Sequence, residues 1–217
     1  MSRGGGGAAR VGGATFERLR DMILAGTLPT GTPLQEKRLT ETLAVSRTPV
    51  REAIVRLISE GLVAREGGMV PVVRRLSIDD FIEILHVRRL LEVEAAGRAA
   101  ERGSVPELIA LRDKFARYRD DANSDYLEQL ETDESLHGLL AKQAGSRLLA
   151  DMIRELRMKT RIFNAARVPD RLRAGSIEHI EIIDAVAAGD VERAKEAMRA
   201  HIDNVRSSVI SHLRRLF

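Results

Sequence analysis

Four residues in the second half of the chain have the types and the spacing of a metal site. Asp133 and His137 stand four positions apart, so they share one face of a helix. His179 and His201 flank a Gly-Asp pair at 189–190, where glycine can end one helix and aspartate can cap the next. Each histidine is then about 15 Å along its helix from the turn, so an antiparallel pair brings the two imidazoles to one level. One carboxylate and three imidazoles suit Zn²⁺, Ni²⁺ or a similar divalent ion, and they leave coordination positions open.

Two arginines indicate a different chemistry, the reading of DNA. Arg47 and Arg51 lie one helical turn apart and off the apolar stripe of the helix over 46–57, so both can point outward together. Their guanidinium forks fit guanine O6 and N7, or phosphate, at the end of a helix in a major groove. Ser46 or Thr48 can cap this helix. The same arginines would also suit an ordinary solvated helix. The neighbouring elements have to distinguish this interpretation from a DNA-reading helix.

The neighbouring elements follow the order of a winged helix-turn-helix. Helices are predicted over 15–25 and 36–43, and a tight turn joins the second of these to the arginine helix. The arginine helix ends at 60–61, where a glycine can adopt the left-handed conformation. Two β-rich runs, 62–65 and 69–73, surround a glycine turn and predict a hairpin, which would be the wing.

After this unit the pattern predicts helices alone, and the protein is expected to be mainly α. The helices are predicted over 77–102, 107–118, 127–144, 147–166, 173–188 and 191–216. They would form an all-α bundle. The domain plan has four parts: a disordered glycine-rich tail (1–13), the winged helix-turn-helix (14–74), a linker (75–78) and an all-α metal- and effector-binding domain (79–217).

Composition narrows the class of protein. The chain has 217 residues and no cysteine, which excludes disulfides and thiolate ligands and fits a reducing cytoplasm. Residues 1–75 hold 12 Lys and Arg against seven Asp and Glu, whereas residues 76–217 hold 23 against 25. The basic excess therefore lies with the arginine helix, as in a nucleic-acid-binding module. No apolar run reaches the roughly 18 residues of a membrane span, and we expect a cytoplasmic protein.

The residues also carry a family resemblance. The stretch 39–53, followed by Leu57 and the sequence Glu-Gly-Leu-Val at 60–63, resembles the winged helix of GntR-type bacterial transcription regulators. The second half is similar to the FCD ligand-binding domain of the FadR subfamily. The matching residues there are Glu178, His179, Ala185, Ala188, Gly189, Asp190, Ala194, Met198, Arg199 and His201.

The resemblance implies homodimers that bind short palindromic operators in double-stranded DNA. It implies DNA contacts at Lys37, Ser46, Arg47, Thr48, Arg51 and Gly68, and metal ligation by Asp133, His137, His179 and His201. A small organic acid would bind at or beside the metal with the help of an arginine. Arg88 matches that arginine, and Arg157 and Arg161 could also line the effector pocket.

We therefore predict a sequence-specific transcription regulator, in the role of a repressor, whose operator affinity changes when a small carboxylic acid binds at the metal. Two alternatives stay open. In one, the open metal activates water in a metalloenzyme with an attached DNA-binding domain. We do not expect an enzyme, because no Glu or His is placed as an obvious base. In the other, the metal is purely structural.

Overall fold

The computed structural model describes residues 5–65, 68–75, 77–121, 124–164 and 171–214, and it divides the chain into two compact units. The first unit consists mainly of the residues up to Ser77, and the second mainly of those from Ile78 on. The division falls inside the predicted linker at 75–78. Among the described helices, none has both the length and the apolar character that crossing a membrane requires.

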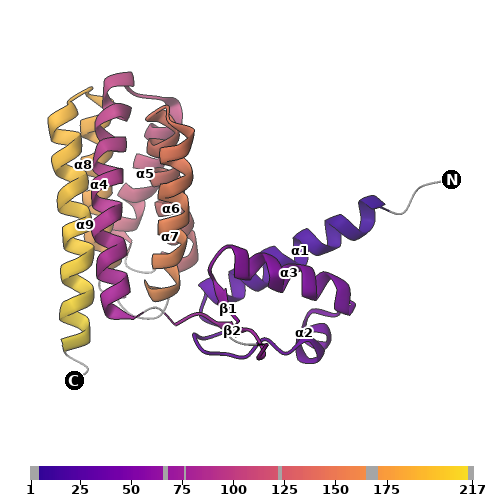
Figure 1. Ribbon diagram of the computed structural model, residues 1–217. Helices are drawn as coiled ribbons and strands as arrows, with labels where there is room; N and C mark the ends of the chain where they lie inside the picture. The colour runs from indigo at the N-terminus through magenta and orange to yellow at the C-terminus, as the bar shows by residue number, and fades with distance from the viewer. Residues whose placement is uncertain (1–4, 66–67, 76, 122–123, 165–170, 215–217) are drawn as a thin grey trace. The chain divides into compact units, whose positions relative to one another are not determined.

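The first unit is a winged helix-turn-helix (Figure 1). Its elements are α1 (Gly5–Leu24), α2 (Glu36–Leu43), α3 (Arg47–Ser59), β1 (Val63–Ala64) and β2 (Val72–Val73). The two strands pair antiparallel, with Val63 opposite Val73, and form the predicted wing with shorter strands than expected. Ala44 adopts a left-handed conformation, with φ of 55°, at the tight turn between α2 and α3.

The apolar stripe of α3 forms the core of this unit. Val50, Ala53, Ile54 and Leu57 are buried, as their helical spacing predicts, and Phe16 of α1 is buried as well. Because α1 and α3 pack against each other, the arginine side of α3 is left on the surface. The stripe therefore orients the candidate DNA-reading face.

Helix α1 begins earlier than the sequence predicts. Residues 5–13 are helical, which corrects the expectation of a disordered tail at these positions, whereas residues 1–4 lie outside the described residues. Gly12 is buried, and a Cβ at this position would lie 2.6 Å from Glu52 Oε2 of α3. That atom is the far end of a flexible side chain, so the early start of α1 rests on its packing against α3, which offsets the low helix propensity of glycine.

The second unit is an all-helical bundle. In the described part of the chain it contains α4 (Ile78–Arg102), α5 (Pro106–Asp120), α6 (Tyr126–Gln143), α7 (Arg147–Asn164), α8 (Arg171–Ala187) and α9 (Val191–Arg214). Helix α4 packs along α9 and also on α6, while α8 packs on both α5 and α9. These contacts join five helices of the bundle, α4, α5, α6, α8 and α9.

The turn between α8 and α9 forms as the sequence predicts. Gly189 has a φ of 69°, and the Asp190 carboxylate accepts a hydrogen bond of 3.1 Å from the backbone N–H of Arg193. Glycine therefore ends α8 and aspartate caps α9. The two helices run back along each other (Figure 1). His179 on α8 and His201 on α9 are both buried.

Two isoleucines on α8 test how far the bundle depends on this packing. Ile183 is 0% exposed and Ile177 is 45% exposed. Ile183→Ala should lower the free energy of unfolding by about 2–5 kcal/mol, because it removes buried methylene groups and leaves a cavity. Ile177→Ala should change it by less than about 0.5 kcal/mol. Urea unfolding of the full chain, followed by circular dichroism, measures both; equal effects would contradict the assigned packing of α8.

Candidate metal centre and nucleic-acid interface

The structure brings the four predicted metal ligands together. Asp133 and His137 come from α6, His179 from α8 and His201 from α9, and one ligand atom of each lies within 4.8 Å of all the others. The ring centroids of His179 and His201 are 4.5 Å apart. His137 lies 5.5 Å from His179 and 5.3 Å from His201 by the same measure. The three imidazoles are buried, whereas the Asp133 side chain is 29% exposed.

The nitrogen atoms of this cluster fit a metal ion. His137 Nε2 and both ring nitrogens of His179 are buried without a hydrogen-bond partner. His179 Nε2 lies 3.1 Å from Asp133 Oδ1, but it is not aligned for a hydrogen bond. A buried polar atom without a partner costs about 1–3 kcal/mol. A cation bound between these lone pairs would remove that cost.

Burial also keeps two of the histidines, His137 and His201, in the neutral form that binds metals. Burial and the nearby His179 lower the pKa of His201 to about 3, against the opposing influence of Glu178. Burial and Arg157 likewise lower the pKa of His137. Burial raises the pKa of Asp133, but the Arg157 guanidinium and the neighbouring histidines outweigh it and hold that pKa well below its usual value. Two of the imidazoles are thus neutral and Asp133 is ionised near neutral pH, as metal ligation requires.

Two carboxylates that sequence reasoning did not assign support the histidines. Glu92 of α4 accepts a hydrogen bond from His137 Nδ1, and Glu178 accepts one of 2.8 Å from His201 Nδ1. Burial raises the pKa of Glu178, but its bonds to His201 and Arg171 bring the pKa to about 2. The sequence held only indirect signals for them: Glu92 lies one turn after Arg88, and Glu178 directly precedes a ligand.

The three arginines predicted to bind the effector differ in their surroundings. Arg88 is 5% exposed and donates to Glu92 at 2.6 Å and to Thr160 at 2.9 Å. Arg157 is 4% exposed and donates to Asp133, Glu134 and Glu92. Arg161 lies in the last turn of α7 and is half-buried, and its Nε has no hydrogen-bond partner. Two of the three guanidinium groups are therefore already bound by carboxylates inside the bundle.

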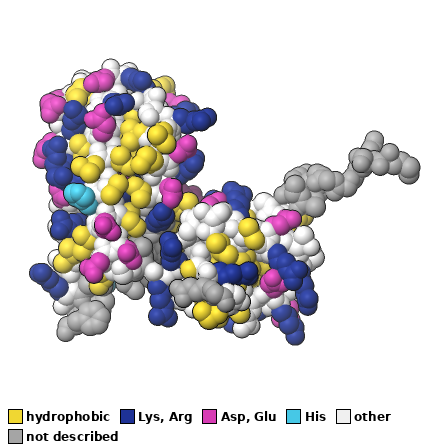
Figure 2. All heavy atoms as spheres, in the orientation of Figure 1, with side chains coloured by type: hydrophobic (Ala, Val, Ile, Leu, Met, Phe, Trp, Pro, Cys, Tyr) yellow, Lys and Arg dark blue, Asp and Glu magenta, His cyan; other side chains and the backbone are white. Residues whose placement is uncertain are grey.

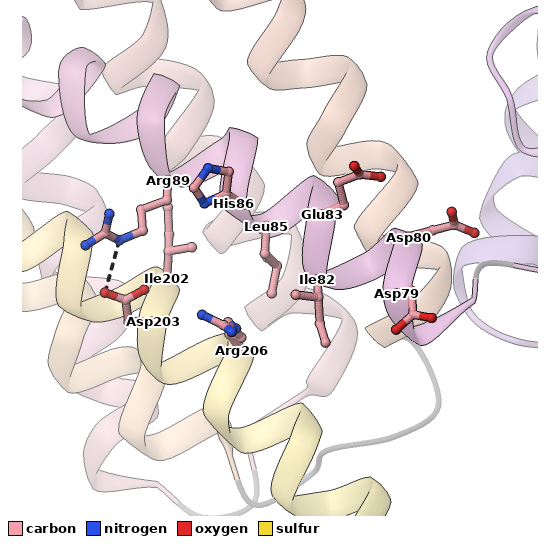
Figure 3. A pocket seen from close by; sticks show the side chains of 10 residues that line it. All are labelled: Asp79, Asp80, Ile82, Glu83, Leu85, His86, Arg89, Ile202, Asp203 and Arg206. Carbon is pink, nitrogen blue, oxygen red and sulfur yellow. Dashed lines mark hydrogen bonds and ion pairs between the residues drawn. The ribbon is translucent and has the colours of Figure 1, made fainter.

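A separate hollow lies between α4 and α9 (Figure 3). Arg89 and Asp203 form an ion pair of 3.0 Å across it, and His86 lines it with its side chain exposed. None of the four predicted ligands contributes to its wall. It is distinct from the histidine cluster.

The residues predicted to touch DNA all lie on the surface of the first unit. Lys37, Ser46, Arg47, Thr48, Arg51 and Gly68 are exposed. Figure 2 shows Lys and Arg side chains over this unit near α2 and α3.

At two of these residues the local hydrogen bonding differs from what the sequence predicts. Arg51 Nε donates to both carboxylate oxygens of Glu36 on α2, at 2.9 and 2.8 Å. Ser46 occupies the N-cap position of α3, but its hydroxyl makes no capping hydrogen bond there, contrary to one of the two caps considered. The exposed hydroxyl is therefore available for a hydrogen bond to another molecule.

Comparisons with known proteins match both units. The model of the FCD domain matches residues 83–204, and that of the bacterial regulatory proteins of the gntR family matches residues 13–70. The HTH-type transcriptional repressor RspR of Escherichia coli K12 is 27% identical over 200 residues, which are 89% of this chain and 86% of that protein. The HTH-type transcriptional regulator LutR of Bacillus subtilis is 30% identical over 210 residues, covering 85% of this chain and 94% of LutR.

A solved structure shows the same fold. The E. coli protein McbR/YncC superposes with a TM-score of 0.77 at 21% identity, covering 93% of this chain and 97% of that one. The curated relatives are transcription regulators and not enzymes. The chain belongs to the GntR family of bacterial transcription regulators, and its second unit is an FCD domain.

Proposed function

We propose that this protein is a repressor whose operator affinity responds to a small organic acid bound at a divalent metal in the FCD domain. The observation that carries the proposal is the cluster of one carboxylate and three buried imidazoles, in which three ring nitrogens lack a hydrogen-bond partner in the described structure. The relative RspR is named as a repressor, which supports that role.

Asp133, His137, His179 and His201 would hold the metal, with Zn²⁺ or Ni²⁺ the best fit to three imidazoles and one carboxylate. A bound divalent ion would supply a Lewis acid with open positions for a carboxylate oxygen. Arg88, Arg157 and Arg161 are the candidate effector contacts. Arg161 offers an N–H group without a partner, whereas Arg88 and Arg157 would have to share their bonds with the carboxylates they already hold.

The DNA-reading end of α3 would act in a homodimer on a palindromic operator. Two copies would place their reader helices in successive major grooves, about 34 Å apart. Arg47 and Arg51 would contact guanine or phosphate, and Lys37, Ser46, Thr48 and Gly68 would fix the register on the backbone. The exposure of all six positions supports these roles.

Connectivity suggests how the two units communicate. Helix α4 begins at Ile78, the last residue of the predicted linker. It carries Glu92, which bonds to His137, and Arg88, which bonds to Glu92. An effector that contacts Arg88 therefore acts on the helix that is joined covalently to the DNA-binding unit. It changes operator affinity only if it binds the two states of the protein with different affinity.

Metal binding should stabilise the protein. With Zn²⁺ or Ni²⁺ at 100 times its dissociation constant, we expect the free energy of unfolding to rise by about 2.7 kcal/mol. His179→Gln should abolish this gain, because it removes a candidate ligand whose two ring nitrogens are buried without a hydrogen-bond partner. His86→Gln, an exposed histidine outside the cluster, serves as the control and should keep it. Thermal unfolding with added metal and metal analysis of the purified chain measure the effect; retention of the gain by His179→Gln would refute the site.

Operator binding should depend on Arg51. Arg51→Ala should weaken binding by about 1–3 kcal/mol if the arginine reads a base. Arg98→Ala is the matched control, since it also breaks an exposed ion pair, with Glu94, but lies in the FCD domain. Fluorescence anisotropy on an operator selected from random duplexes gives both affinities. If Arg51→Ala binds as tightly as the wild type, the assigned role of α3 is wrong.

The effector response should require the metal. A small carboxylic acid should change the operator affinity of the metal-loaded protein, with a coupling of about 1–3 kcal/mol. Chelation should remove that response while DNA binding itself persists. Anisotropy titrations with a panel of hydroxy acids, with and without chelator, measure it. A chain that unfolds on chelation and responds to no acid would instead hold a purely structural metal.

A further inference from the structure

We infer that Glu92 and Glu178 are positioning residues that fix the ring orientation and the tautomer of His137 and His201, and thereby set the metal affinity of the FCD domain. This inference rests on the proposed metal binding. Neither carboxylate is itself one of the four clustered ligands. Each reaches the site through the Nδ1 atom of one histidine.

Glu92 is held from three sides in the centre of the bundle. Its side chain is 2% exposed. Oε1 accepts a hydrogen bond from Arg88 at 2.6 Å, and Oε2 accepts from Arg157 at 3.4 Å and from His137 Nδ1. The carboxylate cannot turn away from His137 without losing its bonds to Arg88 and Arg157.

Glu178 holds His201 in the same manner from α8. Oε2 accepts from His201 Nδ1 at 2.8 Å and from Arg171 at 2.5 Å. Oε1 accepts from Arg171 at 3.1 Å and from Asn204 at 2.9 Å. The carboxylate therefore has a fixed position, and it fixes the imidazole that donates to it.

These contacts decide which nitrogen of each ring faces the cluster. A carboxylate only accepts hydrogen bonds, and a neutral imidazole has a single N–H group. The proton of His137 and of His201 must therefore lie on Nδ1, which leaves the lone pair on Nε2 for a metal. His137 Nε2 is indeed buried and unpartnered, 3.7 Å from Asp133 Oδ1.

His179 differs from the other two histidines because no carboxylate accepts a hydrogen bond from its ring in the described structure. Neither of its nitrogens has a hydrogen-bond partner among the described residues, and its ring lies 4.5 Å from the ring of Phe115. Two of the three imidazoles are thus oriented by a carboxylate, while the third is held by packing. Carboxylates behind metal-binding histidines orient the ring and raise its basicity.

Glu178→Ala tests the inference on the side chain that is less buried of the two. Zn²⁺ affinity, measured on the full chain by competition with a chromophoric chelator, should fall by about 10- to 100-fold. Asp184→Ala is the matched control, because Asp184 also lies on α8 and accepts two hydrogen bonds from one arginine, Arg112, but accepts none from a histidine in the described part of the chain. Its Zn²⁺ affinity should equal that of the wild type.

The protonated ring nitrogen of His201 is a second measurement. It should change on loss of Glu178 only if Glu178 orients the ring, and not if Glu178 merely forms a structural ion pair. Long-range proton–nitrogen correlation spectra of the metal-free chain should show His201 protonated at Nδ1 in the wild type and in Asp184→Ala. In Glu178→Ala the Nε2-protonated form should appear. Glu178→Gln, whose amide oxygen can still accept the Nδ1–H bond, should keep the wild-type tautomer and recover part of the affinity.

Glu92→Gln, with Glu94→Gln as its control on the same helix, repeats the test at His137 if the variant stays folded. The inference is overturned if folded Glu178→Ala binds Zn²⁺ as tightly as the wild type, or if His201 is protonated at Nε2 in the wild type. A wild-type chain that binds neither Zn²⁺ nor Ni²⁺ refutes the proposed function instead. The tautomer spectra still decide the orientation in that case.

Discussion

The charge buried at Glu92 is the constraint on which the FCD domain depends. A carboxylate that is 2% exposed is tolerated only where cations and hydrogen-bond donors surround it. Its partners are Arg88 on its own helix, Arg157 of α7 and His137 of α6. The two carboxylate oxygens of Glu92 therefore link three helices, α4, α6 and α7. One of these hydrogen bonds comes from His137, a candidate metal ligand. The same hydrogen bonds therefore hold the helices together and fix the geometry of the candidate metal site.

The turn at Gly189-Asp190 positions the other two histidines of the cluster. It folds α9 back along α8, so that residues 22 positions apart in the sequence bring their rings to 4.5 Å. Asp190 caps α9 and Glu178 holds His201, so the level of the ring and its rotation are set by different residues. A metal would meet ligands that are already in place, which lowers the conformational entropy that binding has to overcome.

The sequence predicted most helices of both units and the four clustered residues, because these follow from local rules. Helical periodicity, the glycine that ends α8 and the aspartate that caps α9 act within a few residues of each other. The role of Glu92 could not be predicted in this way, since His137 and Arg157 lie 45 and 65 residues away in the sequence. The early start of α1 depends likewise on packing against α3, and the Arg51–Glu36 bridge on the angle between two helices.

An anionic effector, as proposed, would fit the charges around the histidines once a divalent ion is bound. Asp133, Glu92 and Glu134 carry three negative charges, and the guanidinium groups of Arg88 and Arg157 that bind them carry two positive ones. A divalent cation would change this balance from one negative to one positive charge in a largely buried region. Uncompensated charge is costly there, and a carboxylate that enters the open coordination positions would neutralise it. Of the four clustered residues, the Asp133 side chain is 29% exposed, whereas the three imidazoles are buried.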